Sequence, residues 1–288
     1  MASYLEAGGV DMKYTSILFV LLLLFCSATG ALALTAADSD EIVRILTGGQ
    51  REKIILIAKK VSSSGFISEV VYDKMAEVLK KKYREAGTDK IAVDEMSWLC
   101  KALSSSGMDK YKPIVAEVAT NGYSGKLRGY AQRSLRMFKE YAERNRIMAD
   151  RANYNPALSQ EENRLINMLQ GPKIKLVRDA AKTIYRNPAV NAAVYDVAAA
   201  ELLHLYDGGE RSDLTIDTIC WLCKAIGKSG DSKYEQILDE MITRERRREA
   251  DADEGDYETD EFVSTKVIRN ARLGKKLLHE RPAPLSST

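Results

Sequence analysis

The residues best suited to chemistry are the two cysteines of the motif Cys220-Trp221-Leu222-Cys223. A Cys-x-x-Cys pair exchanges disulfides when a lowered pKa keeps one of its thiols deprotonated. Thioredoxin-like proteins place this pair where a strand meets a helix, and no strand pattern precedes Cys220. Cys223 instead falls on an apolar helical stripe, so we expect the cysteines to be structural. A thiol-dependent oxidoreductase with Cys220 and Cys223 as its candidate thiols is the alternative.

A dense group of carboxylates follows a basic run within the segment 244–261. Oxygen ligands can hold Ca²⁺, but the spacing of Gly and Glu here does not fit an EF-hand loop, and we expect no metal. The simplest interpretation is a solvated helix extension followed by an acidic loop. The alternative is a docking surface for a basic partner. Its candidate partner-binding residues are Asp251, Asp253, Glu254, Asp256, Glu258, Asp260 and Glu261.

Other catalytic motifs are missing from the sequence. His204 and His279 are the two histidines, and neither has a Cys or His at a metal-ligand spacing. There is no G-x-S-x-G motif, no phosphate-binding P-loop and no dinucleotide-binding glycine motif. We therefore expect no enzymatic activity and no cofactor. An enzyme with an unrecognised site is kept as an alternative.

The charge balance restricts the partners that the chain can bind. Its 288 residues include 43 Lys and Arg against 41 Asp and Glu, a net charge of +2. This balance provides no basic field for nucleic acid. Hydrophobic residues make up 45% of the chain, which is enough to form a core. We expect a folded protein that binds another protein.

The N-terminal segment has the features of a secretory signal peptide. The uncharged apolar run 16–25 follows Lys13 and precedes the small residues Ala31 and Ala33, in the order of a charged region, an apolar region and a cleavage site. The run is shorter than the roughly 20 apolar residues of a membrane span. We predict a signal peptide over residues 1–33, with Met12 as an alternative start, and a periplasmic or secreted protein without a membrane span after cleavage. An uncleaved anchor would instead make this a membrane-tethered structural protein.

The chain contains an internal duplication. The only two tryptophans, Trp98 and Trp221, lie 123 residues apart within similar segments. The same shift aligns residues 45–118 with residues 168–241 without a gap, and 22 of the 74 aligned pairs are identical. Identity at that level over a gapless alignment indicates two copies of one unit. We place the first copy in residues 34–150 and the second in residues 151–280, with a disordered tail over 281–288.

Each copy has the periodicity of amphipathic helices. Apolar residues stand at i, i+3, i+4 and i+7 on one helix per copy. They are Met96, Leu99, Cys100 and Leu103 in the first copy, and Ile219, Leu222, Cys223 and Ile226 in the second. Trp98 and Trp221 fall beside these stripes, so we expect them to be partly exposed. We also expect Asp94 and Asp217 to cap or begin these helices, with Gly107 and Gly230 at the C-terminal ends.

The pattern predicts an all-α fold of about six helices per copy. Turn-forming residues separate the predicted helices. In the first copy these span 38–46, 51–64, 67–85, 91–105, 109–120 and 125–147; in the second they span 159–169, 172–187, 189–206, 214–228, 231–249 and 260–279. Three helical pairs in 123 residues give about 41 residues per pair, which is the length of a HEAT-type repeat.

Two segments resemble the second helix of a HEAT repeat, which begins with an apolar residue, an arginine and an alanine three places later. These segments are Leu127–Ala131 and Val177–Ala181, while Ile268–Ala271 has its alanine one place early and Ile55 replaces the arginine of the first pair. The resemblance implies a HEAT-like α-solenoid of six helical pairs, arranged as two duplicated three-pair halves. It also implies an exported non-enzymatic protein-interaction scaffold or adaptor, and it assigns no catalytic residue.

Overall fold

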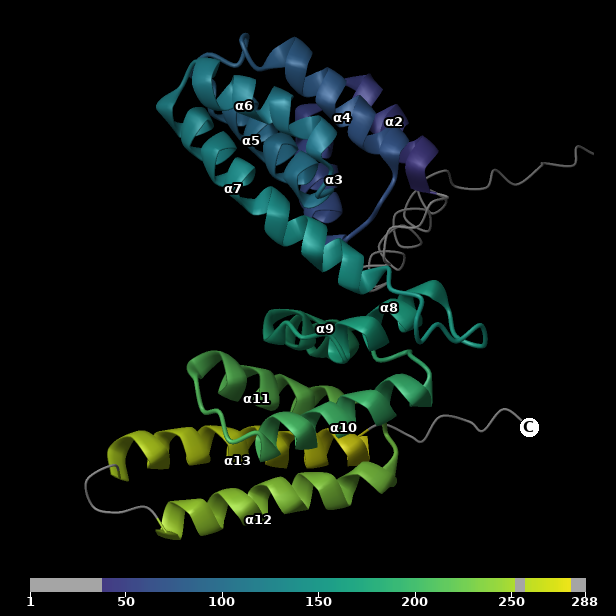
Figure 1. The fold of residues 1–288 in the computed structure, drawn as a ribbon, viewed down its shortest axis with the longest axis vertical. Helices are drawn as coiled ribbons and strands as arrows, with labels where there is room; N and C mark the ends of the chain where they lie inside the picture. Colours follow the sequence, from purple (N-terminus) through teal and green to yellow (C-terminus); the bar gives the residue numbers. More distant parts are fainter. Residues whose placement is uncertain (1–37, 252–256, 281–288) are drawn as a thin grey trace, which may run out of the picture. The chain divides into compact units, whose positions relative to one another are not determined.

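The computed structural model describes residues 38–251 and 257–280, and these residues are helical with no strand among them. The all-α fold predicted from the sequence is confirmed. The predicted signal peptide and C-terminal tail lie outside the described residues. The described part forms twelve α-helices (Figure 1): α2 Ser39–Gly48, α3 Arg51–Ser64, α4 Glu69–Lys82, α5 Lys90–Ser105, α6 Lys112–Asn121, α7 Gly125–Met148, α8 Gln160–Leu169, α9 Ile174–Arg186, α10 Ala192–Asp207, α11 Asp213–Gly227, α12 Glu235–Asp251 and α13 Tyr257–Glu280.

The helix order of the first half recurs in the second half. Short 3₁₀ helices, η3 at Asp109–Tyr111 and η4 at Ser232–Tyr234, precede α6 and α12. From α3 to α6, each helix begins 123 residues before its counterpart, in the pairs α3 and α9, α4 and α10, α5 and α11, η3 and η4, and α6 and α12. This register agrees with the internal duplication inferred from the sequence.

The helices contact one another in two series. In the first half α3 lies against α5 and α5 against α7; in the second half α9 lies against α11 and α11 against α13. Each of these odd-numbered helices also contacts the even-numbered helix that precedes or follows it in the chain, such as α6 with α7 and α12 with α13. The described helices are thus consecutive pairs, each contacting the next pair along the chain, and α7 meets α8 between the halves.

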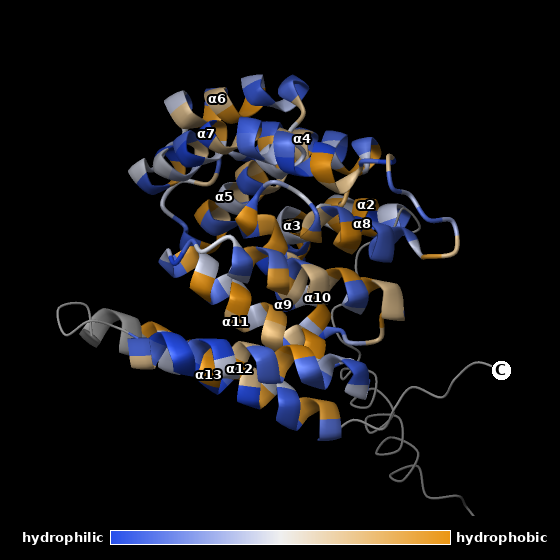
Figure 2. Ribbon diagram, turned by 60° about the horizontal axis from the view of Figure 1, so that its bottom comes forward, coloured by the Kyte–Doolittle hydropathy of each residue, from blue (hydrophilic) through white to orange (hydrophobic). Residues whose placement is uncertain are grey.

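The apolar stripes predicted from the sequence form the core of each half. Leu99 on α5 and Leu222 on α11 are both fully buried, and so are their stripe neighbours on the same helices. Figure 2 shows hydrophobic residues along α9 and α11, whereas α12 is mainly hydrophilic. A helix that is apolar around most of its circumference is buried between neighbours, which explains why α11 lies between α9 and α13.

The helix ends confirm one prediction and correct another. Gly107 and Gly230 have φ of 68° and 71°, the left-handed conformation that glycine adopts without strain. Asp94 and Asp217, however, do not cap α5 and α11 but lie inside them as their fifth residues. The predicted starts at 91 and 214 are within one residue of the observed ones, and the two helices follow Asp89 and Ser212. Those two residues are the N-caps, and their side chains accept hydrogen bonds from backbone N–H groups of the first turn.

Candidate functional site

The structure buries both candidate thiols. Cys220 and Cys223 lie on α11 with 2% and 0% of their surface exposed. The Sγ of Cys220 lies 3.8 Å from the carbonyl oxygen of Lys266 on α13. Burial raises the pKa of Cys220 to about 11 and also raises the pKa of Cys223. A buried thiol with a raised pKa stays protonated at neutral pH and is a poor nucleophile.

The candidate acidic residues fall at the junction of α12 and α13. Asp251 is the last residue of α12 and is exposed. Asp253, Glu254 and Asp256 lie outside the described residues, and Glu258, Asp260 and Glu261 belong to α13, where their side chains are not described. Within residues 38–251 and 257–280, no group of three or more His, Cys, Asp or Glu side chains is placed to hold a metal ion.

Two clusters that the sequence analysis missed lie around the tryptophans. Trp221 on α11 has the Nζ of Lys224 at 3.3 Å and the Nζ of Lys182 at 5.2 Å from its ring centroid. Trp98 on α5 has the Nζ of Lys101 at 4.7 Å and that of Lys59 at 5.1 Å. Lys59 and Lys182 come from the neighbouring helices α3 and α9. The duplication has therefore kept a tryptophan with two lysines at equivalent positions.

The geometry of α11 explains why these side chains gather. Most of the helix is buried, and its partly exposed residues recur at intervals of three or four. Such spacing places them on one face of the helix. They are Leu214, Asp217, Trp221, Lys224 and Lys228. Trp98 and Trp221 are partly exposed, as predicted. The alignment of the two halves at a shift of 123 residues could have revealed both clusters, because Lys59 and Lys101 are retained as Lys182 and Lys224.

The second half adds further groups around its tryptophan. The ring of Tyr185 stands edge-on to Trp221, with centroids 5.7 Å apart, and the Nζ of Lys228 lies 5.4 Å from the Tyr185 centroid. An Nη atom of Arg178 lies 3.5 Å from a carboxylate oxygen of Asp217. We call Arg178, Lys182, Tyr185, Asp217, Trp221, Lys224 and Lys228 the Trp221 cluster, and Lys59, Trp98 and Lys101 the Trp98 cluster.

The electrostatics of the Trp221 cluster favour an anion. Burial lowers the pKa of Lys224, and the positive charge of Lys182 lowers it further, although Asp217 acts in the opposite direction. A nearby anion would stabilise the charged form of Lys224. The arrangement offers ammonium and guanidinium donors beside two aromatic rings, groups that can recognise a charged ligand.

A tyrosine, an aspartate and a lysine form a second duplicated arrangement. Tyr111 donates a hydrogen bond to Asp73 at 2.9 Å, and Lys110 pairs with Asp73 at 3.0 Å. The counterparts Tyr234 and Lys233 contact Asp196 at 2.7 and 2.8 Å. Burial and the bond to Asp73 raise the pKa of Tyr111 to about 12.

These tyrosines remain protonated at neutral pH, and their hydrogen bonds to Asp73 and Asp196 tie η3 to α4 and η4 to α10. An open hollow of about 380 Å³ adjoins the first arrangement. It is lined by Asp73, Ala76, Glu77, Lys80, Lys110, Tyr111, Pro113, Ile114 and Glu117.

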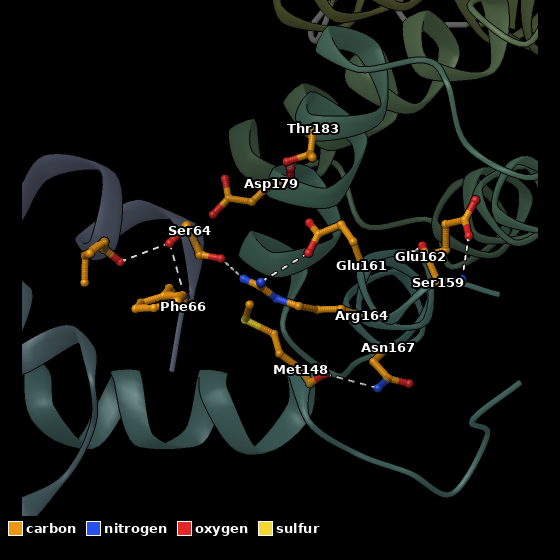
Figure 3. Close-up of polar contacts among 11 residues, drawn as sticks. Ser64, Phe66, Met148, Ser159, Glu161, Glu162, Arg164, Asn167, Asp179 and Thr183 are labelled. Carbon is orange, nitrogen blue, oxygen red and sulfur yellow. Dashed lines mark hydrogen bonds and ion pairs between the residues drawn. The ribbon is translucent and has the colours of Figure 1, made fainter. Parts of the chain in front are cut away.

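Arg164 makes a polar contact between residues of the two halves. Figure 3 shows its side chain extending toward Ser64 at the end of α3, where it donates to the Ser64 carbonyl oxygen. The guanidinium also pairs with Glu161 at 3.2 Å. Burial lowers the pKa of Arg164 and raises that of Glu161. The Nε of Arg164 is buried without a hydrogen-bond partner. Because the remaining contacts are an ion pair with Glu161 and a bond to a backbone carbonyl, we interpret the contact as structural.

No protein-family model, no curated protein and no solved structure matches this chain. Of the described helices, none combines the length and the apolar character required to cross a membrane.

Proposed function

We propose that the protein is a non-enzymatic protein-interaction scaffold, exported to the periplasm or secreted. We further propose that its helical pairs form a HEAT-like α-solenoid with two duplicated halves. The contacts of α3 with α5 and α7, and of α9 with α11 and α13, support this architecture. In a solenoid each repeat contacts its neighbours, and side chains from successive helices together form the binding surface.

The observation that carries the proposal is the recurrence of the tryptophan clusters. Trp98 and Trp221 occupy equivalent places on α5 and α11, and each is only partly buried. Both tryptophans pack against the core of their half with part of their surface exposed, and a partly exposed tryptophan flanked by cations is typical of the residues that dominate protein interfaces. The cluster combines side chains from two helices, as the surface of a repeat protein does.

Two alternative functions, a thiol-dependent oxidoreductase and a membrane-tethered structural protein, require different features of the protein. A thiol-dependent oxidoreductase needs an accessible thiolate, and the burial and raised pKa of Cys220 weigh against that use of the motif. A membrane-tethered structural protein depends on whether residues 1–33 are removed. N-terminal sequencing of the protein isolated from its source cells decides between the cleaved and the tethered form.

The scaffold proposal is tested by capturing partners with the full-length protein. Trp221→Ala and Trp98→Ala variants are crosslinked in their native compartment and compared with Tyr154→Ala, which alters an exposed aromatic residue in the loop between α7 and α8. We expect Trp221→Ala to reduce recovery of a specific partner, with circular dichroism confirming an intact fold. Equal recovery with all three folded variants would refute the proposal.

A further inference from the structure

We infer that the Trp221 cluster binds a carboxylate-rich segment of a partner protein. The inference rests on the proposed scaffold function and deepens it, because it names the chemistry of the partner at one surface. The acidic segment is held by the ammonium groups of Lys182 and Lys224, while its apolar side chains contact the edges of Trp221 and Tyr185.

The charge of the cluster favours an acidic partner. Among its basic side chains are Arg178, Lys182 and Lys224, and the carboxylates paired with the first two are Asp217 and Asp179, the latter 3.9 Å from Arg178. Asp217 lies 3.5 Å from Arg178 and 4.0 Å from Lys182. Among the described carboxylates none forms an ion pair with Lys224. The cluster therefore has more positive than negative charge, and a carboxylate between Lys182 and Lys224 would form charge-assisted hydrogen bonds.

The Trp221 ring is suited to a peptide more than to a nucleic acid. Lys224 lies 3.3 Å from the Trp221 centroid, in a cation–π contact that covers part of the ring face. Nucleic-acid recognition by tryptophan needs an open face on which a base can stack. A chain with a net charge of +2 also lacks the long-range field that attracts a polyanion. A short acidic peptide needs neither feature.

The side chains of the cluster are only partly accessible. The side chains of Arg178 and Lys182 are 28% and 24% exposed, and Trp221 and Lys224 are partly buried as well. A narrow peptide segment reaches side chains between two helices more readily than a flat bilayer does. The favoured partner is therefore an acidic protein segment.

The Trp98 cluster serves as the matched internal control. It has the tryptophan and both lysines, but Ile55, Ser62 and Ser105 occupy the positions of Arg178, Tyr185 and Lys228. Asp94, the counterpart of Asp217, pairs instead with Lys126 at 3.0 Å. If the additional groups determine binding, the first half binds the same peptide more weakly.

The test is a direct binding measurement with the full-length protein at low salt. A fluorescent glutamate-rich peptide containing one phenylalanine is compared with the same peptide carrying glutamine in place of glutamate. Lys182→Gln/Lys224→Gln is compared with Lys59→Gln/Lys101→Gln by fluorescence anisotropy. Lys182 and Lys224 are partly exposed, and Lys59 and Lys101 are exposed. Lysine-to-glutamine changes at these sites should preserve the fold, and thermal melts verify this for each double variant.

We expect the acidic peptide to bind and the glutamine peptide not to bind. Lys182→Gln/Lys224→Gln should weaken binding about tenfold or more, because two charge-assisted contacts are lost. Binding should also weaken with added salt. The Lys59→Gln/Lys101→Gln variant should retain nearly all of the affinity.

Three results would overturn the inference: no binding of the acidic peptide, the same affinity in both double variants, or preferential binding of duplex DNA or of phosphatidylglycerol vesicles through Lys182 and Lys224. The scaffold proposal and the acidic-peptide inference can fail independently of each other. If Trp221→Ala abolishes capture of a partner but acidic peptides do not bind, the scaffold survives and the acidic chemistry is wrong.

Discussion

The two halves of the chain share their packing but differ around their tryptophans. Both keep the buried leucines of α5 and α11, the tyrosine–aspartate bond and the lysine pair over the tryptophan. Only the second half adds Arg178, Tyr185 and Lys228. Residues required for packing persist in both copies, whereas residues on the exposed face can change without disturbing the core. We therefore expect a binding function specific to the second half to depend on the residues that only the Trp221 cluster contains.

The halves also differ in how they bury a carboxylate. Glu245 is fully buried, and Arg211 holds both of its oxygens at 2.8 and 2.9 Å. Glu95 in the first half is equally buried, but its ion-pair partners Lys82 and Arg51 are 31% and 46% exposed. Water can replace an exposed partner more readily than a buried one, so these two carboxylates should respond differently to the same kind of mutation.

The largest expected effect is the loss of the Arg211 guanidinium. Arg211→Met leaves the Glu245 charge buried without its partner and should destabilise the protein by about 3–5 kcal/mol. Lys82→Met should cost at most about 1 kcal/mol, since that lysine is partly exposed and Arg51 remains beside Glu95. Urea unfolding of both variants checks the difference. Equal losses would show that the two buried carboxylates are equivalent.

Truncation of the core leucines should affect the halves alike. Leu99→Ala and Leu222→Ala each remove a side chain with 0% exposure, and each should cost about 2–5 kcal/mol. Denaturant melts of the two variants measure this directly. A loss below about 0.5 kcal/mol in either variant would mean that the buried face of that helix is wrongly assigned.

Acid should weaken the second half through Glu245. Burial raises the pKa of Glu245, but the bonds from Arg211 outweigh this, and the folded-state pKa is lower than the ordinary value. The pair therefore contributes stability above the unfolded pKa of about 4.3, and this contribution disappears as the pH falls through the folded pKa. The stability difference between the wild type and Glu245→Gln should shrink as the pH is lowered. A difference that stays constant with pH would exclude this linkage.

A smaller effect is expected for the cysteine motif. Cys220→Ser should cost less than Cys223→Ser, because the Lys266 carbonyl oxygen lies 3.8 Å from the Cys220 Sγ and a small shift between α11 and α13 would let the serine hydroxyl donate to it. Cys223→Ser buries a hydroxyl at a fully apolar position and should cost about 1–3 kcal/mol. Thermal melts compare the two. Insulin-reduction activity that disappears in Cys220→Ser would instead favour the oxidoreductase alternative.

The sequence predicted the helices well for two reasons. The apolar stripes are visible within a single helix, and the 123-residue register is visible when one half of the chain is aligned with the other. Leu99, Leu222 and both glycine ends follow from such patterns. The start of α5 was predicted to within one residue, but its N-cap is Asp89 and not Asp94, because only the residue directly before the helix can place its side chain against the free N–H groups of the first turn. The partners of Trp221 come from two helices, so neither helix by itself indicates the cluster. The alignment of the two halves shows that the lysines beside each tryptophan are retained. Arg211 and Glu245 have no identical counterparts in the first half, so the alignment does not indicate their ion pair.

The smallest expected effect on stability concerns the acidic segment that distinguishes the second half. The first half connects α6 to α7 through Gly122–Ser124 without this segment, and Val267 and Ala271, which anchor α13 in the core, follow it. Deleting residues 250–260 also retains the Glu245–Arg211 pair. The melting temperature should therefore change by less than about 2 °C.

The same deletion tests whether the acidic segment binds a partner or is only a solvated connection. The segment 251–261 contains seven carboxylates and no lysine or arginine, so it should attract a basic surface of a partner. This attraction should weaken with added salt, because the Debye length falls from about 10 Å at 0.1 M to about 3 Å at 1 M. Recovery of the partner in a crosslinking pull-down at low salt should decrease in the deletion variant. The Lys182→Gln/Lys224→Gln variant provides the comparison, because it removes cations and not carboxylates. Undiminished recovery after the deletion would leave the Trp221 cluster as the binding surface and the acidic segment as a solvated connection between α12 and α13.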